Sequence, residues 1–299
     1  VSGNFHLYIL AMDDRCYEVL LDLALPYVTP IKLHEFETEE ILKAKATRSR
    51  GEYCWMCMPP FIKYLLKNYN LDYCTEVDAD MLFYQDPQIL IDELIDSGCS
   101  VQFVEHRFAK NDNREWFVGK YCTQLNTIKN DEIGNAFLDE WIEKCYESTA
   151  AIKDGIHWGE QKYLDSLVEK YKEHVHSLEN LGGGVAPWNL KQYRYVNTIN
   201  NKIFLEEKNS GKVFSLVFYH FEGLYYFDKN SALVPLYLET DNRGFIKSLY
   251  TDYLLLIKNA KRLLENNYSI SFYIKGHPNL SSAYQGKWKN LKRIKYYML

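Results

Sequence analysis

The stretch Thr75-Glu76-Val77-Asp78-Ala79-Asp80-Met81-Leu82-Phe83-Tyr84-Gln85-Asp86-Pro87 places two carboxylates at the end of a short apolar segment. Side chains alternate between faces on an extended chain, so Asp78 and Asp80 are predicted to point the same way, with Ala79 turned into the sheet. Paired carboxylates suit Mg²⁺ or Mn²⁺, which hold the oxygens of a diphosphate. Because open α/β sheets bind ligands at the carboxyl ends of strands, the stretch indicates a metal-assisted site for a nucleotide sugar.

The sequence on either side of the pair favours this interpretation over a solvated turn, in which an Asp-x-Asp triplet also occurs. Residues 73–77 are predicted to form a buried strand, and residues 81–84 an apolar continuation of it. Asp86-Pro87 then stops the strand before a helix at residues 88–95.

Strands and helices alternate along most of the chain, which favours an α/β fold with a mixed, mostly parallel central sheet flanked by helices. We predict strands at residues 5–11, 28–33, 73–77, 100–105, 125–128 and 213–221, and helices at residues 13–23, 37–46, 61–68, 88–95, 131–146 and 159–170. The expected organisation is a catalytic domain at residues 1–229 and a helical extension at residues 230–299.

The composition is that of a globular protein from a reducing compartment. A chain of 299 residues with 47% hydrophobic content can bury a full core. Seven cysteines, an odd number, argue against a disulfide framework, and no second pair joins Cys54 and Cys57 to complete a zinc site. No apolar run is long enough to span a bilayer and no secretion signal is seen, so we expect a cytoplasmic protein.

The net charge of −5 conceals a basic carboxyl-terminal tail. After Glu265 the sequence has no acidic residue, and its cations are interleaved with Tyr and Trp. Such a tail suits an anionic membrane surface, because cations meet lipid phosphates while the rings lie at headgroup level. Residues 275–299 therefore predict peripheral attachment to the inner face of the cytoplasmic membrane, although a solvated tail without a partner explains them equally well. The acidic body argues against nucleic acid as a partner.

Two further segments contain candidate polar site residues. Glu160 and Gln161 open the predicted helix at residues 159–170, where an acid and an amide could face a reacting sugar. A first-turn glutamate favoured by the helix dipole is an equally good explanation. His220 ends the strand at residues 213–221, and its ring nitrogen could complete a metal shell, although a histidine there is more often a hydrogen-bonded structural residue.

The segment Gly182-Gly183-Gly184-Val185-Ala186-Pro187-Trp188-Asn189 is rarer. Three consecutive glycines remove every Cβ and let the backbone approach a ligand closely, and Trp188 offers a flat face for a sugar ring or an apolar wall. We expect the nucleotide sugar to contact Gly183, Gly184 and Trp188, together with the turn Asp78-Ala79-Asp80.

Taken in order, the motifs of the chain resemble those of bacterial glycosyltransferases encoded in surface-polysaccharide clusters, and more distantly the family 8 retaining transferases of GT-A fold. The resemblance covers roughly residues 5–225 and rests on EYCW, DADMLFYQDP, EHRF, YCTQLNTIKND, GEQKYLD, GGGVAPWN and YHFEGL.

The resemblance implies roles for residues that the sequence alone leaves open. It implies that Asp78, Asp80 and His220 ligate manganese. It places Thr123, Gln124 and Asn126 against the donor and acceptor sugars. Glu160 and Gln161 would lie behind the anomeric carbon.

The chain departs from the family 8 pattern where positive charge is needed. In that family a lysine holds the diphosphate, whereas here Tyr225 and Tyr226 stand near the corresponding position. The arginine expected on the helix before the Asp pair is also missing. Arg48, Arg50 or Lys162 would have to supply the charge.

The sequence thus predicts a metal-dependent glycosyltransferase, using Mn²⁺ or Mg²⁺, that moves a sugar from a UDP-sugar to a glycan or lipid-linked acceptor in surface-polysaccharide biosynthesis. Retention of configuration is implied by the distant family alone. The alternative is a noncatalytic nucleotide-sugar or polysaccharide binding protein with the same fold. A nucleotidyltransferase would need a Gly-rich basic loop after its first strand, and none follows Ala11.

Strand counting gives one more expectation. Three strands are predicted through Val77, whereas family 8 folds reach the Asp pair on their fourth, so we expect that the chain lacks a first strand-helix unit of about 30 residues. In the alternative registration, residues 5–11 are the true first strand, and Asp13 or Asp14 touches the nucleotide.

Overall fold

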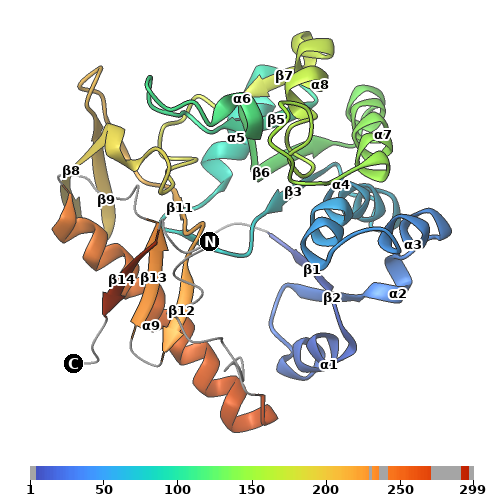
Figure 1. The fold of residues 1–299 in the computed structure, drawn as a ribbon, viewed down its shortest axis with the longest axis horizontal. Helices are drawn as coiled ribbons and strands as arrows, with labels where there is room; N and C mark the ends of the chain where they lie inside the picture. Colours follow the sequence, from blue (N-terminus) through green and yellow to red (C-terminus); the bar gives the residue numbers. More distant parts are fainter. Residues whose placement is uncertain (1–4, 229–230, 236–241, 271–290, 296–299) are drawn as a thin grey trace.

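The computed structural model describes residues 5–228, 231–235, 242–270 and 291–295 (Figure 1). Its centre is a four-stranded sheet of order β3-β6-β5-β7, formed by β3 (Tyr73–Val77), β6 (Tyr121–Lys129), β5 (Val101–Glu105) and β7 (Val175–Ser177). β6 is antiparallel to both β3 and β5, whereas β5 and β7 are parallel. Three strands therefore run one way and β6 runs against them, which confirms the expected α/β class with a mixed, mostly parallel sheet.

Helices cover both faces of this sheet. α4 (Arg50–Asn68) and α7 (Glu132–Glu147) share one core with the sheet residues Phe103 and Ile128. α5 (Gln88–Ser97) contributes Leu90 to a core on the other face, together with Val104 and Leu125. Neighbouring residues of one strand thus enter opposite cores, as the alternation of side chains along a strand requires.

The amino-terminal part adds a second, parallel pair of strands, β1 (Leu7–Ala11) and β2 (Val28–Lys32), on the right of Figure 1. Asp13 accepts a hydrogen bond from the backbone N–H of Cys16 and thereby caps α1 (Asp14–Leu23). The remaining short helices are α2 (Leu33–Phe36), α3 (Glu39–Lys45), α6 (Glu115–Val118) and α8 (Leu164–Lys170), with 3₁₀ turns at Lys172–His174 and Leu190–Gln192.

One helix begins much earlier than predicted. α4 starts at Arg50 instead of residue 61, because Ser49 and Glu52 form a capping box in which each side chain accepts the backbone N–H of the other. The helix then continues through Pro59 and Pro60, whose rings are buried. Packing of these rings offsets the loss of two backbone donors, which normally ends a helix.

The strand predicted at residues 213–221 is divided into two. β10 (Val213–Ser215) pairs with β9 (Lys202–Glu207), which pairs in turn with β8 (Tyr193–Ile199). β11 (Phe218–His220) instead pairs antiparallel with β4 (Met81–Phe83), the apolar continuation expected after the Asp pair. The break lets one segment serve two sheets.

The carboxyl-terminal part contains α9 (Arg243–Tyr268) and a sheet of β12 (Tyr225–Asp228), β13 (Ser231–Pro235) and β14 (Leu291–Lys295). Ile246 and Tyr250 of α9 lie in the same core as Tyr219 and Phe221. The domain boundary at residue 229 stays a prediction. Most of the basic, aromatic tail at residues 275–299 lies outside the described residues, and no described helix is both long and apolar enough to cross a membrane.

Candidate active site

The pairing of β4 with β11 brings the Asp pair to His220. Met81 is opposite His220 in the register, and the backbone N–H of Phe221 donates to the carbonyl of Asp80 at 2.8 Å. Residues 78–80 form a turn between β3 and β4, so the extended geometry predicted for them is wrong, and Ala79 is exposed instead of turned into the sheet. The carboxylates converge because the chain turns from one sheet into the next.

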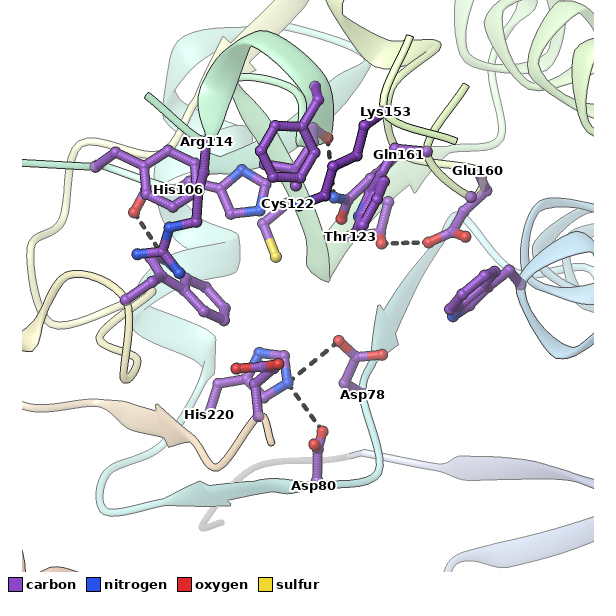
Figure 2. A pocket seen from close by; sticks show the side chains of 18 residues that line it. Asp78, Asp80, His106, Arg114, Cys122, Thr123, Lys153, Glu160, Gln161 and His220 are labelled. Carbon is purple, nitrogen blue, oxygen red and sulfur yellow. Dashed lines mark hydrogen bonds and ion pairs between the residues drawn. The ribbon is translucent and has the colours of Figure 1, made fainter. Parts of the chain in front are cut away.

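Asp78, Asp80 and His220 form a cluster of metal-ligand type, with one ligand atom from each lying within 4.8 Å of the others (Figure 2). Nε2 of His220 is 2.9 Å from Oδ1 of Asp80 and 3.7 Å from Oδ2 of Asp78. Two carboxylates and an imidazole are a donor set for a divalent cation such as Mn²⁺. The structure therefore brings together the three residues expected to hold the metal.

The electrostatics of the cluster favour a cation at its centre. Burial, with the neighbouring charge of Asp80, raises the pKa of Asp78 to about 6, although His220 acts in the opposite direction. Burial also acts to raise the pKa of Asp80, but the hydrogen bond and charge of His220 outweigh it and lower that pKa. The single imidazole of His220 thus interacts with two carboxylates, and a divalent ion would neutralise the charge of both.

Gln124 fixes His220 from behind. Its Oε1 lies 3.0 Å from Nδ1 of His220, and the amide is completely buried. An Nδ1–H donated to this oxygen leaves Nε2 free to face the two aspartates, which is how outer partners orient metal-binding histidines. Gln124 does not line the cavity, so its place is behind the metal cluster instead of against a sugar.

The cluster opens into a cavity of about 450 Å³. Its polar lining includes every residue predicted to act at the metal or the anomeric carbon, namely Asp78, Asp80, Glu160, Gln161 and His220. Of the three residues predicted to contact the sugars, Thr123 lines the cavity as well. In Figure 2, His220 and Asp80 lie on one side of this cavity, and Thr123 and Gln161 on the other.

Glu160 is a buried acid with a fixed orientation. The hydroxyl of Thr123 donates to its Oε1 at 2.6 Å, and the indole N–H of Trp141 donates to its backbone carbonyl at 2.8 Å. Burial raises the pKa of Glu160 to about 7 despite the hydrogen bond from Thr123, and Asp78 adds to the increase. α8 begins only at Leu164, so the explanation of Glu160 as a first-turn glutamate is wrong. Such a carboxyl can carry either charge state near neutral pH.

Gln161 and Asn126 occupy different places. Nε2 of Gln161 donates to the carbonyl of Val118 at 2.9 Å, and Gln161 lines the cavity. Asn126 does not line it; its Nδ2 donates to Oε2 of Glu76 at 2.8 Å. Burial, with the charges of Asp78 and Glu160, raises the pKa of Glu76 well above its ordinary value. Asn126 therefore orients the partly buried carboxyl group of Glu76, outside the lining of the cavity.

In the structure, the glycines at positions 183 and 184 permit close packing within the protein, whereas contact with a ligand was predicted. Gly183 and Gly184 do not line the cavity. A Cβ on Gly183 would lie 2.6 Å from Cδ2 of Leu178, and one on Gly184 would lie 2.5 Å from Cγ1 of Val104. The close approach that these glycines permit is to the protein's own side chains. Trp188 does line the cavity.

The indole of Trp188 is held in place by its neighbours. Its N–H donates to the carbonyl of His106 at 2.8 Å, and its ring meets that of His220 edge to face, with centroids 5.3 Å apart. The ring therefore forms an apolar wall beside the metal cluster.

Several lining residues were missed by sequence analysis: His106, Arg114, Phe117, Lys153 and Trp158. The EHRF motif was a signal for His106, whereas Phe117 lies in the short helix α6 and the others lie in segments without a recognisable motif. The cations proposed instead lie elsewhere. Arg48 donates to the carbonyl of Tyr146 at 2.8 Å, Lys162 pairs with Asp165 at 2.8 Å, and neither they nor Arg50 line the cavity.

No protein-family model matches the chain. Two Bacillus subtilis (strain 168) proteins are similar to it. Uncharacterized protein YfnD is 28% identical over 262 residues, covering 85% of this chain and 80% of YfnD. Uncharacterized protein YfnF is 30% identical over 231 residues, covering 75% of this chain and 73% of YfnF. Among solved structures, mouse xyloside xylosyltransferase 1 in its apo form aligns with a TM-score of 0.41 at 11% identity, over 73% of this chain and 83% of that one.

Proposed function

Because the chain belongs to the family of the uncharacterized Bacillus subtilis proteins YfnD and YfnF, whose names state no activity, we propose a function from its own site. The protein is a metal-dependent glycosyltransferase of GT-A type that transfers a sugar from a nucleoside diphosphate sugar, expected to be a UDP-sugar. The acceptor is a glycan or lipid-linked molecule of a bacterial surface polysaccharide.

The observation that carries this proposal is the cluster of Asp78, Asp80 and His220 at one side of a cavity of about 450 Å³. When bound there, Mn²⁺ or Mg²⁺ neutralises charge that grows on the leaving diphosphate. The two aspartates supply hard oxygen ligands, and Gln124 holds the imidazole in the orientation that exposes Nε2. The volume of the cavity lies within the usual range of small-molecule sites, about 300–1,000 Å³.

Glu160 and Gln161 act on the sugar. The carboxylate of Glu160 stabilises positive character at the anomeric carbon, and the hydroxyl of Thr123 keeps it oriented. The amide of Gln161 is fixed by Val118 and offers its oxygen to the sugar. Trp188 and Phe117 line the same cavity and reduce the access of water that would hydrolyse the donor. Retention of configuration is the proposed outcome.

Nucleotide release from a panel of UDP-, GDP- and dTDP-sugars, measured with Mn²⁺ and with EDTA, tests the proposal. We expect nucleotide release from one donor of the panel, and only in the presence of the metal. Asp78→Asn should abolish this release. If a donor binds in a metal-dependent way but no nucleotide is released with any acceptor preparation, the result would support the noncatalytic binding protein instead. Unchanged release in EDTA would remove the metal mechanism.

The cellular setting is proposed from the sequence. The basic, aromatic tail at residues 275–299 attaches the protein to the inner face of the cytoplasmic membrane, where a lipid-linked acceptor would be within reach.

A further inference from the structure

A hairpin contributes to the cavity wall on the side opposite Asp80 and His220 (Figure 2). Ala151 and Trp158 pair antiparallel, and the N–H of Ile152 donates to the carbonyl of His157 at 3.0 Å. Asp154 holds the turn by accepting the N–H groups of Ile156 and His157, both at 2.8 Å. Lys153 lies in this hairpin and lines the cavity. The hydrogen bonds of the hairpin fix the conformation of its backbone.

The ammonium group of Lys153 lies over an aromatic platform. Its Nζ is 4.6 Å from the centre of the Phe117 ring, which is only 8% exposed. The Phe117 ring meets that of Trp158 edge to face, with centroids 5.0 Å apart. The Trp55 ring lies against Gly159; a Cβ added to this glycine would be 3.6 Å from the ring. Three rings and one cation thus line this part of the cavity.

Lys153 forms no ion pair with any residue in the described part of the chain. The neighbouring carboxylate of Asp154 is occupied by Nδ1 of His157 at 2.7 Å. The other cavity-lining cation outside the histidines, Arg114, is matched by a two-point contact with Asp112 at 2.9 and 2.7 Å. The positive charge of Lys153 is therefore not compensated by a neighbouring carboxylate.

The position of Lys153 indicates which part of a substrate it meets. The chain of contacts runs from Lys153 to Phe117 and on to Val118, whose carbonyl accepts from Gln161. In Figure 2, Lys153 and Gln161 lie on the side of the cavity opposite Asp80 and His220. The function proposed above places the sugar at Glu160 and Gln161, so with the diphosphate at the metal cluster the sugar, and not the phosphates, would lie on the side of Lys153.

We propose, on the basis of the function proposed above, that a sugar bound in this cavity carries an anionic substituent, a carboxylate or a phosphate, which Lys153 binds. The aromatic rings pack against the apolar face of that sugar, while the ammonium group supplies the countercharge. The acidic sugar is either the transferred group of the donor or the terminal residue of the acceptor.

Calorimetric binding to the full chain with Mn²⁺ separates these two sources. The donor arm compares UDP-glucuronate with UDP-glucose. The acceptor arm compares glucuronate and glucose 6-phosphate with glucose, each with and without UDP. We expect the acidic member to bind roughly threefold to tenfold more tightly in one arm, as for an ion pair between partly exposed groups. That arm identifies the source.

Three variants assign the preference. Lys153→Met keeps an unbranched side chain, one atom shorter, but removes its charge, so the preference should disappear. Lys153→Arg should keep it. Lys144→Met is the matched control, because Lys144 also lies over a ring, that of Tyr163 at 5.9 Å, but does not line the cavity. Unchanged melting temperatures would show that all three variants fold.

Equal binding of acidic and neutral sugars in both arms, including no binding at all, would overturn the inference, as would a preference that survives in Lys153→Met. UDP provides the separate control for the proposed function. If Mn²⁺-dependent binding of UDP is lost in Asp78→Asn but kept in Lys153→Met, the proposed function is supported. This conclusion does not depend on whether acidic sugars bind more tightly than neutral ones.

Discussion

Nδ1 of His220 lies 3.0 Å from Oε1 of Gln124, so a completely buried amide sets the orientation of the imidazole between the two aspartates. Gln124→Leu should release the ring and weaken binding of Mn²⁺ by about 10- to 100-fold, the usual effect of losing such a partner. The rise in melting temperature on adding Mn²⁺ measures this directly.

Gln102→Leu is the control for this variant. Gln102 is also completely buried in the central sheet, but it donates to the carbonyl of Leu90, away from the cavity. It should lose stability without losing the response to Mn²⁺. Equal responses of both variants to Mn²⁺ would contradict the positioning role of Gln124.

The two aspartates should differ in the metal-free protein. The folded pKa of Asp78 is raised to about 6, so its ionised form costs stability above that pH, and Asp78→Asn should raise the melting temperature in EDTA at pH 8. The folded pKa of Asp80 is lowered, so its ionised form contributes stability above about pH 4, and Asp80→Asn should lower the melting temperature.

Both variants should lose turnover and the stabilisation by Mn²⁺, because each removes one charged ligand. Asp139→Asn, on the surface of α7, should keep both. Full turnover in either cluster variant would exclude the proposed metal site.

Glu160 gives a pH-dependent prediction. Its folded pKa of about 7 lies above the ordinary value of 4.5, so the folded protein holds a proton that the unfolded chain has lost between these two values. Stability therefore falls with rising pH across this window. Glu160→Gln should raise the free energy of unfolding by on the order of 1–3 kcal/mol at pH 8 and change it little at pH 4.5.

Thermal unfolding at the two pH values in EDTA measures this effect. Glu169→Gln, on an exposed pair with Lys172, is the control and should show no such dependence. The Glu160 variant should also lose nucleotide release at every pH. A stabilised variant with normal release would remove Glu160 from the reaction.

Gly184→Ala should destabilise the fold. The new Cβ would lie 2.5 Å from Cγ1 of Val104, and the φ of +96° is unfavourable for any residue with a Cβ. A loss of about 1–3 kcal/mol follows from overpacking and backbone strain. Gly244→Ala, which meets nothing within 4 Å in α9, should be neutral or slightly stabilising in urea unfolding.

Removal of residues 275–299 should abolish binding to vesicles that contain anionic lipid, while transfer to a water-soluble acceptor persists. Salt should weaken the binding of the full chain, because it screens the basic side chains. Equal sedimentation of both forms with such vesicles at low salt would reject the membrane role of the tail.

The sequence predicted the elements around the Asp pair because local patterns determine them. The strand at Tyr73–Val77, the stop at Asp86-Pro87 and the cap at Asp131 all follow from neighbouring residues. The early start of α4 was also readable, since Ser49 and Glu52 have capping-box spacing, but two prolines concealed it.

The interior roles could not be read in the same way. Gln124 and Asn126 alternate with residues of the opposite face on β6, and only the packed structure shows that they reach His220 and Glu76 instead of the cavity. Lys153 and Trp158 lie on a hairpin that no pattern marks. Their function depends on distant partners, which sequence spacing does not encode.

The pairing of β4 with β11 also orders events during synthesis. Asp80 leaves the ribosome 140 residues before His220, the difference between the two positions, so a nascent chain holds two ligands of the cluster long before the third exists. Closing so distant a contact is slow compared with forming a helix. A growing polypeptide that ends before β11 therefore lacks one of the three side chains, and the complete cluster can form only in molecules whose translation has passed that strand.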